Sequence, residues 1–164
     1  MVRWLIGGSV FSALVLLIGT IAVSGSISKH HDDATSSFIG VTRIAIDSRD
    51  ADVTIRRGGP RVTLHRRVGW SWARPVVSEH QVGGTLTVTT ACNDQSGVEV
   101  TVNCAVSYEI EAPREVGVTA SAERISITGL TGPLDLTASG PITVTGRPAA
   151  LTAHSRAGRV DVHP

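Results

Sequence analysis

The chain has 164 residues, a length typical of one folded domain, and its formal net charge is +1. This near-neutral balance gives no electrostatic reason to expect a nucleic-acid partner. Aromatic residues make up 4% of the chain and charged residues 18%, while Val, Thr, Ile, Gly and Ala are abundant. Such a composition favours strands and tight turns over helices.

The chain begins with an uncharged apolar stretch, WLIGGSVFSALVLLIGTIAV, at residues 4–23. About 20 helical residues span the hydrocarbon core of a bilayer, so residues 4–25 are predicted to form a transmembrane helix. Arg3 precedes it, which predicts a cytoplasmic tail at 1–3 and an N-in, single-pass protein of the bacterial plasma membrane. The alternative is a cleaved signal peptide and a secreted protein, because Ala22 and Ser24 form a small-x-small site.

Residues 26–38 are mostly small and polar and show no periodicity, so they are predicted to be a flexible linker. The run HHDD at 30–33 contains metal-binding side chain types. A solvated tether beside the membrane is the simpler interpretation of this run. We therefore predict no metal site and no cofactor.

Two cysteines, Cys92 and Cys104, bracket the segment NDQSGVEVTVN. An oxidising compartment outside the cytoplasm would pair them in a disulfide. Metal ligation is the alternative, but two thiolates need further ligands and no nearby His completes a set. The sequence therefore favours the disulfide.

Apolar residues alternate with polar ones from Val41 onwards, which is the period of a β-strand. The alternating segments RIAI, DVTI, RVTL, TLTV and VSYEI are separated by turn formers such as RGGP and Gly83–Gly84. No stretch after residue 25 shows a convincing helical period. Residues 39–164 are thus predicted to form an all-β domain outside the cytoplasm.

Similar strand-and-turn units recur about every 17 residues in the last third of the chain. ISIT begins at 125, ITVT at 142 and RVDV at 159, and VGVTAS at 116 matches LDLTAS at 134. So short a period indicates stacked units, which predicts a parallel β-solenoid or β-roll. The predicted core of the stack is Val116, Val118, Ile125, Ile127, Leu134, Leu136, Ile142, Val144, Leu151 and Val160.

The units TASGPITVTG, RRVGWSWARPVV with GGTLTVTT, and CAVSYEIEAP resemble a bacterial envelope family of repeated β-strands called "putative adhesin", a domain of unknown function. The resemblance covers roughly residues 41–164 and implies an adhesin-like surface role. Family members carry Ser-Gly-Asp in the repeat turns, whereas these turns read SAER, SGP and RAGR. No role of that Asp is therefore carried over to this chain.

An arginine-tryptophan segment occupies residues 56–74, a stretch without any Asp or Glu. Arginine suits phosphate and carboxylate groups and also stacks on indole rings. The alternative is that the arginines coat the solvent side of strands while the tryptophans pack over one end of the core. The candidate ligand- or partner-binding residues are Arg56, Arg57, Arg61, Arg66, Arg67, Trp70, Trp72 and Arg74.

Sequence motifs give little reason to expect an enzyme. Glu109 and Glu111 alternate on one segment and could act as a carboxylate pair of a glycan-active enzyme, but a polar strand face explains them more simply. There is no P-loop, zinc spacing, dinucleotide fingerprint or nucleophile elbow in the sequence. No catalytic residue is predicted.

The sequence thus predicts a non-catalytic envelope surface protein with an adhesin-like binding or scaffolding domain. Its expected partners are the membrane that it spans once and either an anionic wall polymer, lipid head groups or a membrane protein. A second hypothesis is a sensory accessory subunit of an envelope-stress system. Gly7, Gly8 and Gly19 offer close-packing points for another helix in that case.

Overall fold

The structure is a computed structural model, and it describes residues 30–71, 74–92 and 104–164. The chain divides into two compact units, residues 1–30 and 31–164. The predicted tail and transmembrane helix at 1–25 lie outside the described residues. Among the residues that are described, no helix is long and apolar enough to cross a membrane.

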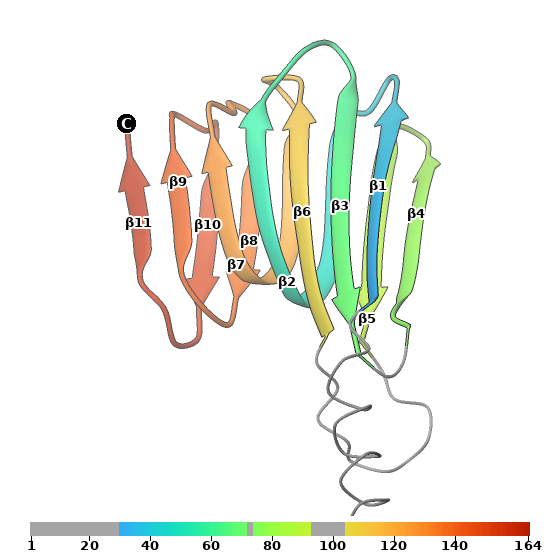
Figure 1. Cartoon of the computed structure of the whole chain (residues 1–164). Coiled ribbons are helices and arrows are strands. Elements are labelled where there is room, and N and C mark those ends of the chain that lie inside the picture. Colours follow the sequence, from blue (N-terminus) through green and yellow to red (C-terminus); the bar gives the residue numbers. More distant parts are fainter. Residues whose placement is uncertain (1–29, 72–73, 93–103) are drawn as a thin grey trace, which may run out of the picture. The chain divides into compact units, whose positions relative to one another are not determined.

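The described residues form β-strands joined by turns, which confirms the all-β prediction (Figure 1). The strands are β1 (His30–Phe38), β2 (Arg43–Arg57), β3 (Val62–Trp70), β4 (Val76–Val82), β5 (Thr85–Ala91), β6 (Cys104–Ala112), β7 (Gly117–Thr128), β8 (Leu134–Ala138), β9 (Ile142–Thr145), β10 (Leu151–Ser155) and β11 (Val160–His163). They belong to one 11-stranded sheet.

Two long strands, β2 and β7, fold this sheet over on itself. Residues 43–47 of β2 pair with β5, whereas residues 51–57 pair with β6, and the register shifts between Ser48 and Asp52. In the same way, β7 pairs first with β8 and then with β9. The result is two facing layers. Layer A contains β1, β3, β6, β9, β11 and the second halves of β2 and β7; layer B contains β4, β5, β8, β10 and the first halves of β2 and β7.

The sheet is mixed, so the prediction of a purely parallel solenoid is not met. Strands β2, β7, β8, β9, β10 and β11 pair in parallel, but β3 with β6 and β4 with β5 pair antiparallel. The physical reason is clear for β4 and β5. They are joined by Gly83 and Gly84, whose φ angles of 55° and 79° suit a two-residue hairpin turn.

The repeat registers agree with the 17-residue spacing at two places and differ from the sequence alignment at two. Ile125 pairs with Ile142, and Leu134 pairs with Leu151. Leu134 pairs with Val118 rather than with Val116, and Ile142 pairs with Val160 rather than with Arg159. The differences arise because the turns vary in length between units, whereas each strand must keep its apolar positions facing the interior.

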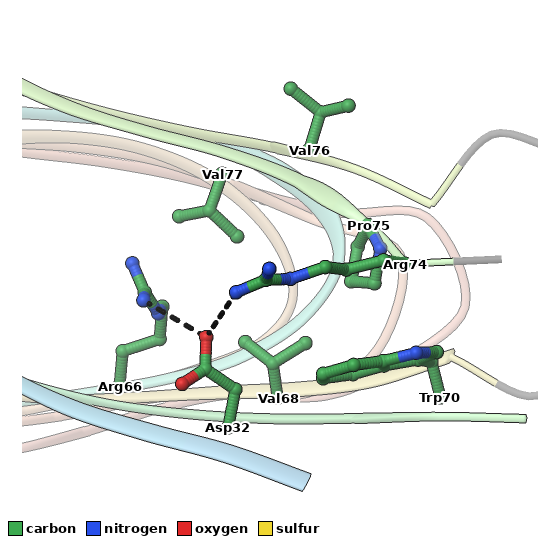
Figure 2. Close-up of a pocket in the computed structure, with 8 residues that line it drawn as sticks. All are labelled: Asp32, Arg66, Val68, Trp70, Arg74, Pro75, Val76 and Val77. Atoms are coloured by element: carbon green, nitrogen blue, oxygen red, sulfur yellow. Dashed lines mark hydrogen bonds and ion pairs between the residues drawn. The ribbon is translucent and has the colours of Figure 1, made fainter. Parts of the chain in front are cut away.

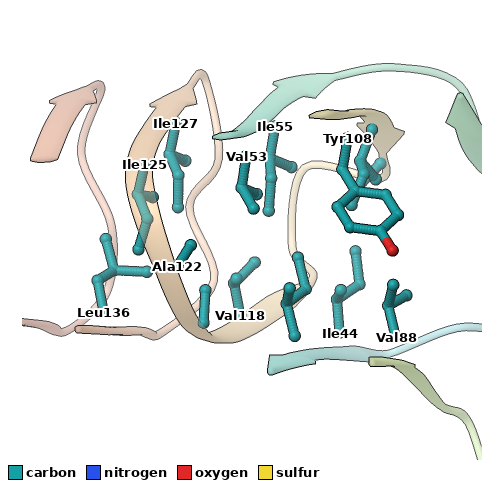
Figure 3. Close-up of a cluster of buried hydrophobic side chains, with 14 of the residues drawn as sticks. Ile44, Val53, Ile55, Val88, Tyr108, Val118, Ala122, Ile125, Ile127 and Leu136 are labelled. Carbon is teal, nitrogen blue, oxygen red and sulfur yellow. The ribbon is translucent and has the colours of Figure 1, made fainter. Parts of the chain in front are cut away.

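The core lies between the two layers, where apolar side chains of both layers meet (Figure 3). Eight of the ten predicted core residues are buried, from Val116 to Val144. The prediction is wrong for Val160, which is 38% exposed, and Leu151 is only partly buried. These two residues lie on β11 and β10, each of which pairs with a single strand of the described part of the chain.

The predicted linker at 26–38 also differs from the structure, because its residues from His30 onwards form β1. This strand lies beside β3 at one edge of layer A. Its burial alternates: Asp32, Ala34, Ser36 and Phe38 are partly buried, and the residues between them are exposed. The segment is therefore a strand whose inner face carries both polar and apolar side chains.

Candidate functional site

Strand β3 places one arginine of the arginine-tryptophan segment inside the domain. Val62, Leu64 and Val68 are buried on the inner side of β3, and Arg66 shares their alternation. The Arg66 side chain is consequently only 16% exposed. An inward arginine needs carboxylate partners, since burying an unpaired charge costs several kcal/mol.

Two neighbouring strands supply these partners. Nη1 of Arg66 lies 2.6 Å from Oε1 of Glu79 on β4, and Nη2 lies 3.4 Å from Oδ2 of Asp32 on β1. Ser36 donates a hydrogen bond of 2.8 Å to the other carboxylate oxygen of Glu79. Nε of Arg66 is buried and has no hydrogen-bond partner among the described residues. Polar groups from β1, β3 and β4 thus meet inside one end of the domain.

A cavity of about 280 Å³ opens beside this cluster (Figure 2). Arg74 reaches into it from the segment before β4, and its Nη2 lies 3.2 Å from Oδ2 of Asp32. The guanidinium carbon of Arg74 lies 5.6 Å from the centre of the Trp70 ring, within cation–π range. The cavity is lined by Asp32, Arg66, Val68, Trp70, Arg74, Pro75, Val76 and Val77.

The charges around this arginine pocket are balanced within the protein. Asp32 accepts from both Arg66 and Arg74, and Glu79 is the second carboxylate of Arg66. The two guanidinium groups therefore converge on a carboxylate, which is the geometry that binds carboxylate and phosphate oxygens. Valine and tryptophan side chains form the rest of the wall. The pocket suits a ligand that combines an anionic group with apolar surface.

The remaining arginines of the segment lie elsewhere. Arg56 pairs with Glu111 at 2.8 Å and Arg67 with Glu109 at 3.2 Å, both on the outer side of layer A. Arg57 and Arg61 are exposed and make no ion pair with a described residue. Trp72 lies outside the described residues. The structure therefore brings together Arg66, Trp70 and Arg74 and separates them from the other candidates.

Glu109 and Glu111 project to the same outer side of β6, as the alternation predicts. Each is held by an arginine of a neighbouring strand, and their side chains are 42% and 39% exposed. They lie on an open strand surface rather than in the arginine pocket. In the described part of the chain, no three residues of His, Cys, Asp and Glu gather as metal ligands.

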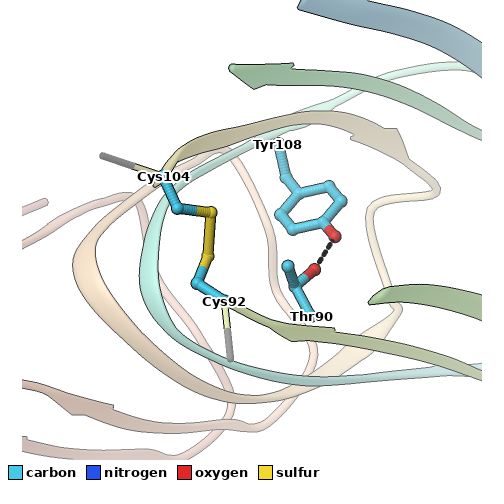
Figure 4. Close-up of a disulfide and its surroundings, with 4 residues drawn as sticks. All are labelled: Thr90, Cys92, Cys104 and Tyr108. Carbon is cyan, nitrogen blue, oxygen red and sulfur yellow. Dashed lines mark hydrogen bonds between the residues drawn. A yellow bond between two sulfur atoms is a disulfide. The ribbon is translucent and has the colours of Figure 1, made fainter. Parts of the chain in front are cut away.

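A buried tyrosine lies close to the pocket. Tyr108 on β6 is opposite Arg66, and its hydroxyl hydrogen-bonds the hydroxyl of Thr90 on β5, which joins the two layers (Figure 4). Burial raises the pKa of Tyr108 above the ordinary value of 10.0, while the hydrogen bond from Thr90 acts in the opposite direction. The predicted disulfide between Cys92 and Cys104 is formed, two residues beyond Thr90.

Sequence reasoning missed three members of this site: Asp32, Glu79 and Tyr108. The sequence pattern places Asp32 in a linker and gives Glu79 and Tyr108 no role. A signal existed for Arg66, because it has the same alternation as Val62, Leu64 and Val68. An arginine on the apolar side of a strand predicts a carboxylate partner in a neighbouring strand.

No protein-family model and no curated protein sequence matches the chain. The solved structures that partly match this chain include a putative cell adhesion protein from Clostridium sporogenes, with a TM-score of 0.46 and 7% identity over 82% of this chain and 99% of that one. A putative lipid binding protein from Parabacteroides distasonis has a TM-score of 0.34 and 11% identity over 80% of this chain and 60% of that one. A putative adhesin from Bacteroides fragilis has a TM-score of 0.34 and 6% identity over 82% of this chain and 96% of that one.

Proposed function

We propose that this protein is a non-catalytic surface protein of the bacterial envelope that contacts anionic envelope material through the arginine pocket. The observation that carries the proposal is the convergence of Arg66 and Arg74 on one carboxylate, Asp32, beside the Trp70 ring. A phosphate or carboxylate of a ligand can take the place of the Asp32 carboxylate. The apolar wall then receives the neighbouring part of the ligand, as in the head-group region of a lipid.

The folded domain serves as the scaffold of this pocket. The parallel pairing from β7 to β11 supports interpreting that part as a short solenoid, and the antiparallel strands β3 to β6 carry the pocket. With the predicted membrane anchor at residues 4–25, the domain and its pocket would lie outside the cytoplasm.

A fluorescence titration tests the proposal. In the full chain with Trp4→Phe and Trp72→Phe, Trp70 is the sole remaining indole, since the chain has three Trp. The protein, held in neutral detergent micelles, is titrated with mixed micelles containing phosphatidylglycerol or phosphatidylcholine, at low and high salt. We expect a salt-sensitive change of Trp70 emission with phosphatidylglycerol only.

Two variants locate the effect. Arg74→Ala should weaken the response about tenfold, because a charge-assisted contact is lost. Arg61→Ala removes an equal charge from the same segment, outside the pocket, and should leave the response unchanged. Equal loss in both variants would indicate diffuse charge attraction, and a silent titration would contradict the proposal.

The sensory hypothesis is favoured by one observation, the position of Asp32 on β1. This strand follows directly on the predicted juxtamembrane residues, and Asp32 is the group that a ligand would displace. Ligand binding would then loosen the first strand after the anchor. Amide hydrogen exchange of β1 should speed up with phosphatidylglycerol in the wild-type chain. Unchanged exchange at saturating ligand would rule out this coupling.

A further inference from the structure

A second hollow surface lies on the outer side of layer B, away from the inward-facing arginine pocket. Its floor is made by residues of adjacent parallel strands: Asp47 and Ser121 pair in register, and Ser121 pairs with Thr137. Two residues earlier on each of the two strands, Thr119 of β7 pairs with Asp135 of β8. These side chains point away from the core, because their neighbours on each strand are buried.

Two hollows share this floor. The larger is an open groove of about 280 Å³ that includes Thr87, Thr119, Asp47 and Asp135. The smaller, of about 90 Å³, lies between Arg49 and Arg156 and is also lined by Ser139. Ser121 and Thr137 line both hollows, so the two adjoin and together make up the groove.

The groove carries opposite charges at its two ends. Arg49 and Arg156 flank the small hollow, whereas Asp47 and Asp135 lie in the larger one. In the described part of the chain, none of these four residues takes part in an ion pair, in contrast to Arg66 and Arg74. Glu123, at the corner of the sheet, is paired with Arg124 at 3.5 Å. Both arginines of the groove are therefore available to an external anion.

From this arrangement we propose that the groove binds a polyhydroxylated anion, such as a glycan or polyol chain that bears carboxylate or phosphate groups. The two arginines would hold the acid group by charge-assisted hydrogen bonds. The hydroxyl groups of Ser121 and Thr137 can both donate and accept, and the carboxylates of Asp47 and Asp135 accept from ligand hydroxyls. No aromatic side chain lines this groove, and its one large apolar lining residue, Ile46, is almost fully buried, whereas Trp70 and three valines line the arginine pocket.

The strand spacing suits an extended ligand. Neighbouring strands lie about 4.8 Å apart, so the hydroxyl and carboxylate groups of β2, β7 and β8 recur at this interval across the sheet. Arg49 lies within β2 at an exposed position, and Arg156 comes directly after the end of β10. Strands β7 and β8 lie between β2 and β10 in the sheet. A chain laid over β7 and β8 would thus meet polar groups repeatedly and an arginine from either side.

Isothermal titration of the full chain in neutral detergent micelles tests the proposal with three soluble probes. Oligogalacturonate carries carboxylates, poly(glycerol phosphate) carries phosphodiesters, and a dextran oligomer of equal size carries hydroxyl groups alone. We expect binding of one or both acidic probes, and their comparison identifies the acid group. Dextran should bind at least about tenfold more weakly, because it offers nothing to the arginines.

Three variants assign the binding to the groove. The double variant Arg49→Ala with Arg156→Ala should weaken binding of the acidic probe about tenfold or more. Thr137→Phe should block the groove sterically without removing charge. The double variant Arg114→Ala with Arg147→Ala removes the same charge from exposed turns outside the groove and is the matched control.

Wild-type affinity in both groove variants, or no binding of either acidic probe, would overturn the proposal. An equal loss in the control variant would also overturn it, since the attraction would then be non-specific. The outcome is independent of the function proposed for the arginine pocket. Arg74→Ala should leave binding of the acidic probe intact, and the groove variants should leave the phosphatidylglycerol response intact.

Discussion

Arg66 of β3 and Glu79 of β4 form an ion pair of 2.6 Å that crosses the interior of the domain. The side chains are 16% and 11% exposed, so the pair is largely removed from water. It links layer A to layer B at the end of the domain where β1 and the arginine pocket lie. The stability of this end therefore depends on a polar contact as well as on the apolar core.

Replacing Arg66 by Met should lower the free energy of unfolding by about 2 to 3 kcal/mol. The substitution keeps an unbranched apolar stem but removes the guanidinium group, which leaves Glu79 without its arginine and Asp32 with Arg74 alone. Urea denaturation measures the change. The control is Arg67→Met, whose side chain is 66% exposed and pairs with Glu109 on the surface. This control should alter stability by no more than about 0.5 kcal/mol, and an equal loss in both variants would contradict an interior role for Arg66.

The alkaline stability of the domain should depend on Tyr108. Burial raises the pKa of Tyr108 in the folded protein above 10.0, the ordinary value that applies in the unfolded chain. Below the unfolded pKa, Tyr108 is protonated in both states and its contribution is fully present. As pH rises above about 10, the unfolded chain loses this proton first, so stability falls until the folded pKa is passed.

Tyr108 is the chain's one tyrosine, so phenolate absorbance reports its titration directly. We expect a midpoint above 10.0 in the native protein and a return toward 10.0 in urea. Tyr108→Phe should remove this part of the alkaline loss of stability and cost about 1 kcal/mol at neutral pH through the lost bond to Thr90. A native midpoint at or below 10.0 would contradict the buried environment of the phenol.

The alternation of apolar residues was sufficient to predict the strands and most of the core. Ile125 and Ile142 could be paired from the sequence because ISIT and ITVT have the same apolar alternation at a spacing of 17 residues. Val118 and Leu134 could not, because the intervening turns differ in length and only the packing of neighbouring strands sets the register. Val160 has the pattern of a core residue, but its burial depends on a neighbour beside β11 that the described residues do not supply.

The candidate site was less predictable than the fold, because it depends on contacts between distant segments. Asp32 and Arg74 are 42 residues apart, and nothing local marks them as partners. The segment that contains Asp32 lacks a clear apolar alternation, since the inward positions of β1 hold Asp32 and Ser36 as well as Ala34 and Phe38. Arg49 and Arg156 come together only because β2, β7, β8 and β10 stack in parallel register.

The disulfide between Cys92 and Cys104 should stabilise the domain by about 3 kcal/mol, because it closes a short loop in the unfolded chain. Replacing both cysteines by Ser should lower the urea midpoint accordingly, and reduction of the wild-type protein should have the same effect. The reductant should not change the midpoint of the Ser variant. If reduction left the wild-type midpoint unchanged, the bond would contribute nothing to the equilibrium stability of the domain.

Gly132 should be intolerant of any side chain, because the turn before β8 lies against the backbone at Val116. A Cβ atom at Gly132 would lie 2.2 Å from the carbonyl oxygen of Val116, so the backbone would have to move. Gly132→Ala should therefore cost about 1 to 3 kcal/mol, the usual penalty of overpacking. Gly59→Ala is the control, since a Cβ atom there meets nothing within 4 Å. Thermal unfolding of the two variants compares a crowded turn with an open one. Gly59 lies in an ordinary backbone conformation, so Gly59→Ala should leave the midpoint of thermal unfolding unchanged or slightly raise it. Equal midpoints of thermal unfolding for the two variants would show that the turn can move away from Val116 at little cost. The close contact between the turn and Val116 would then not be the reason for a glycine at this position.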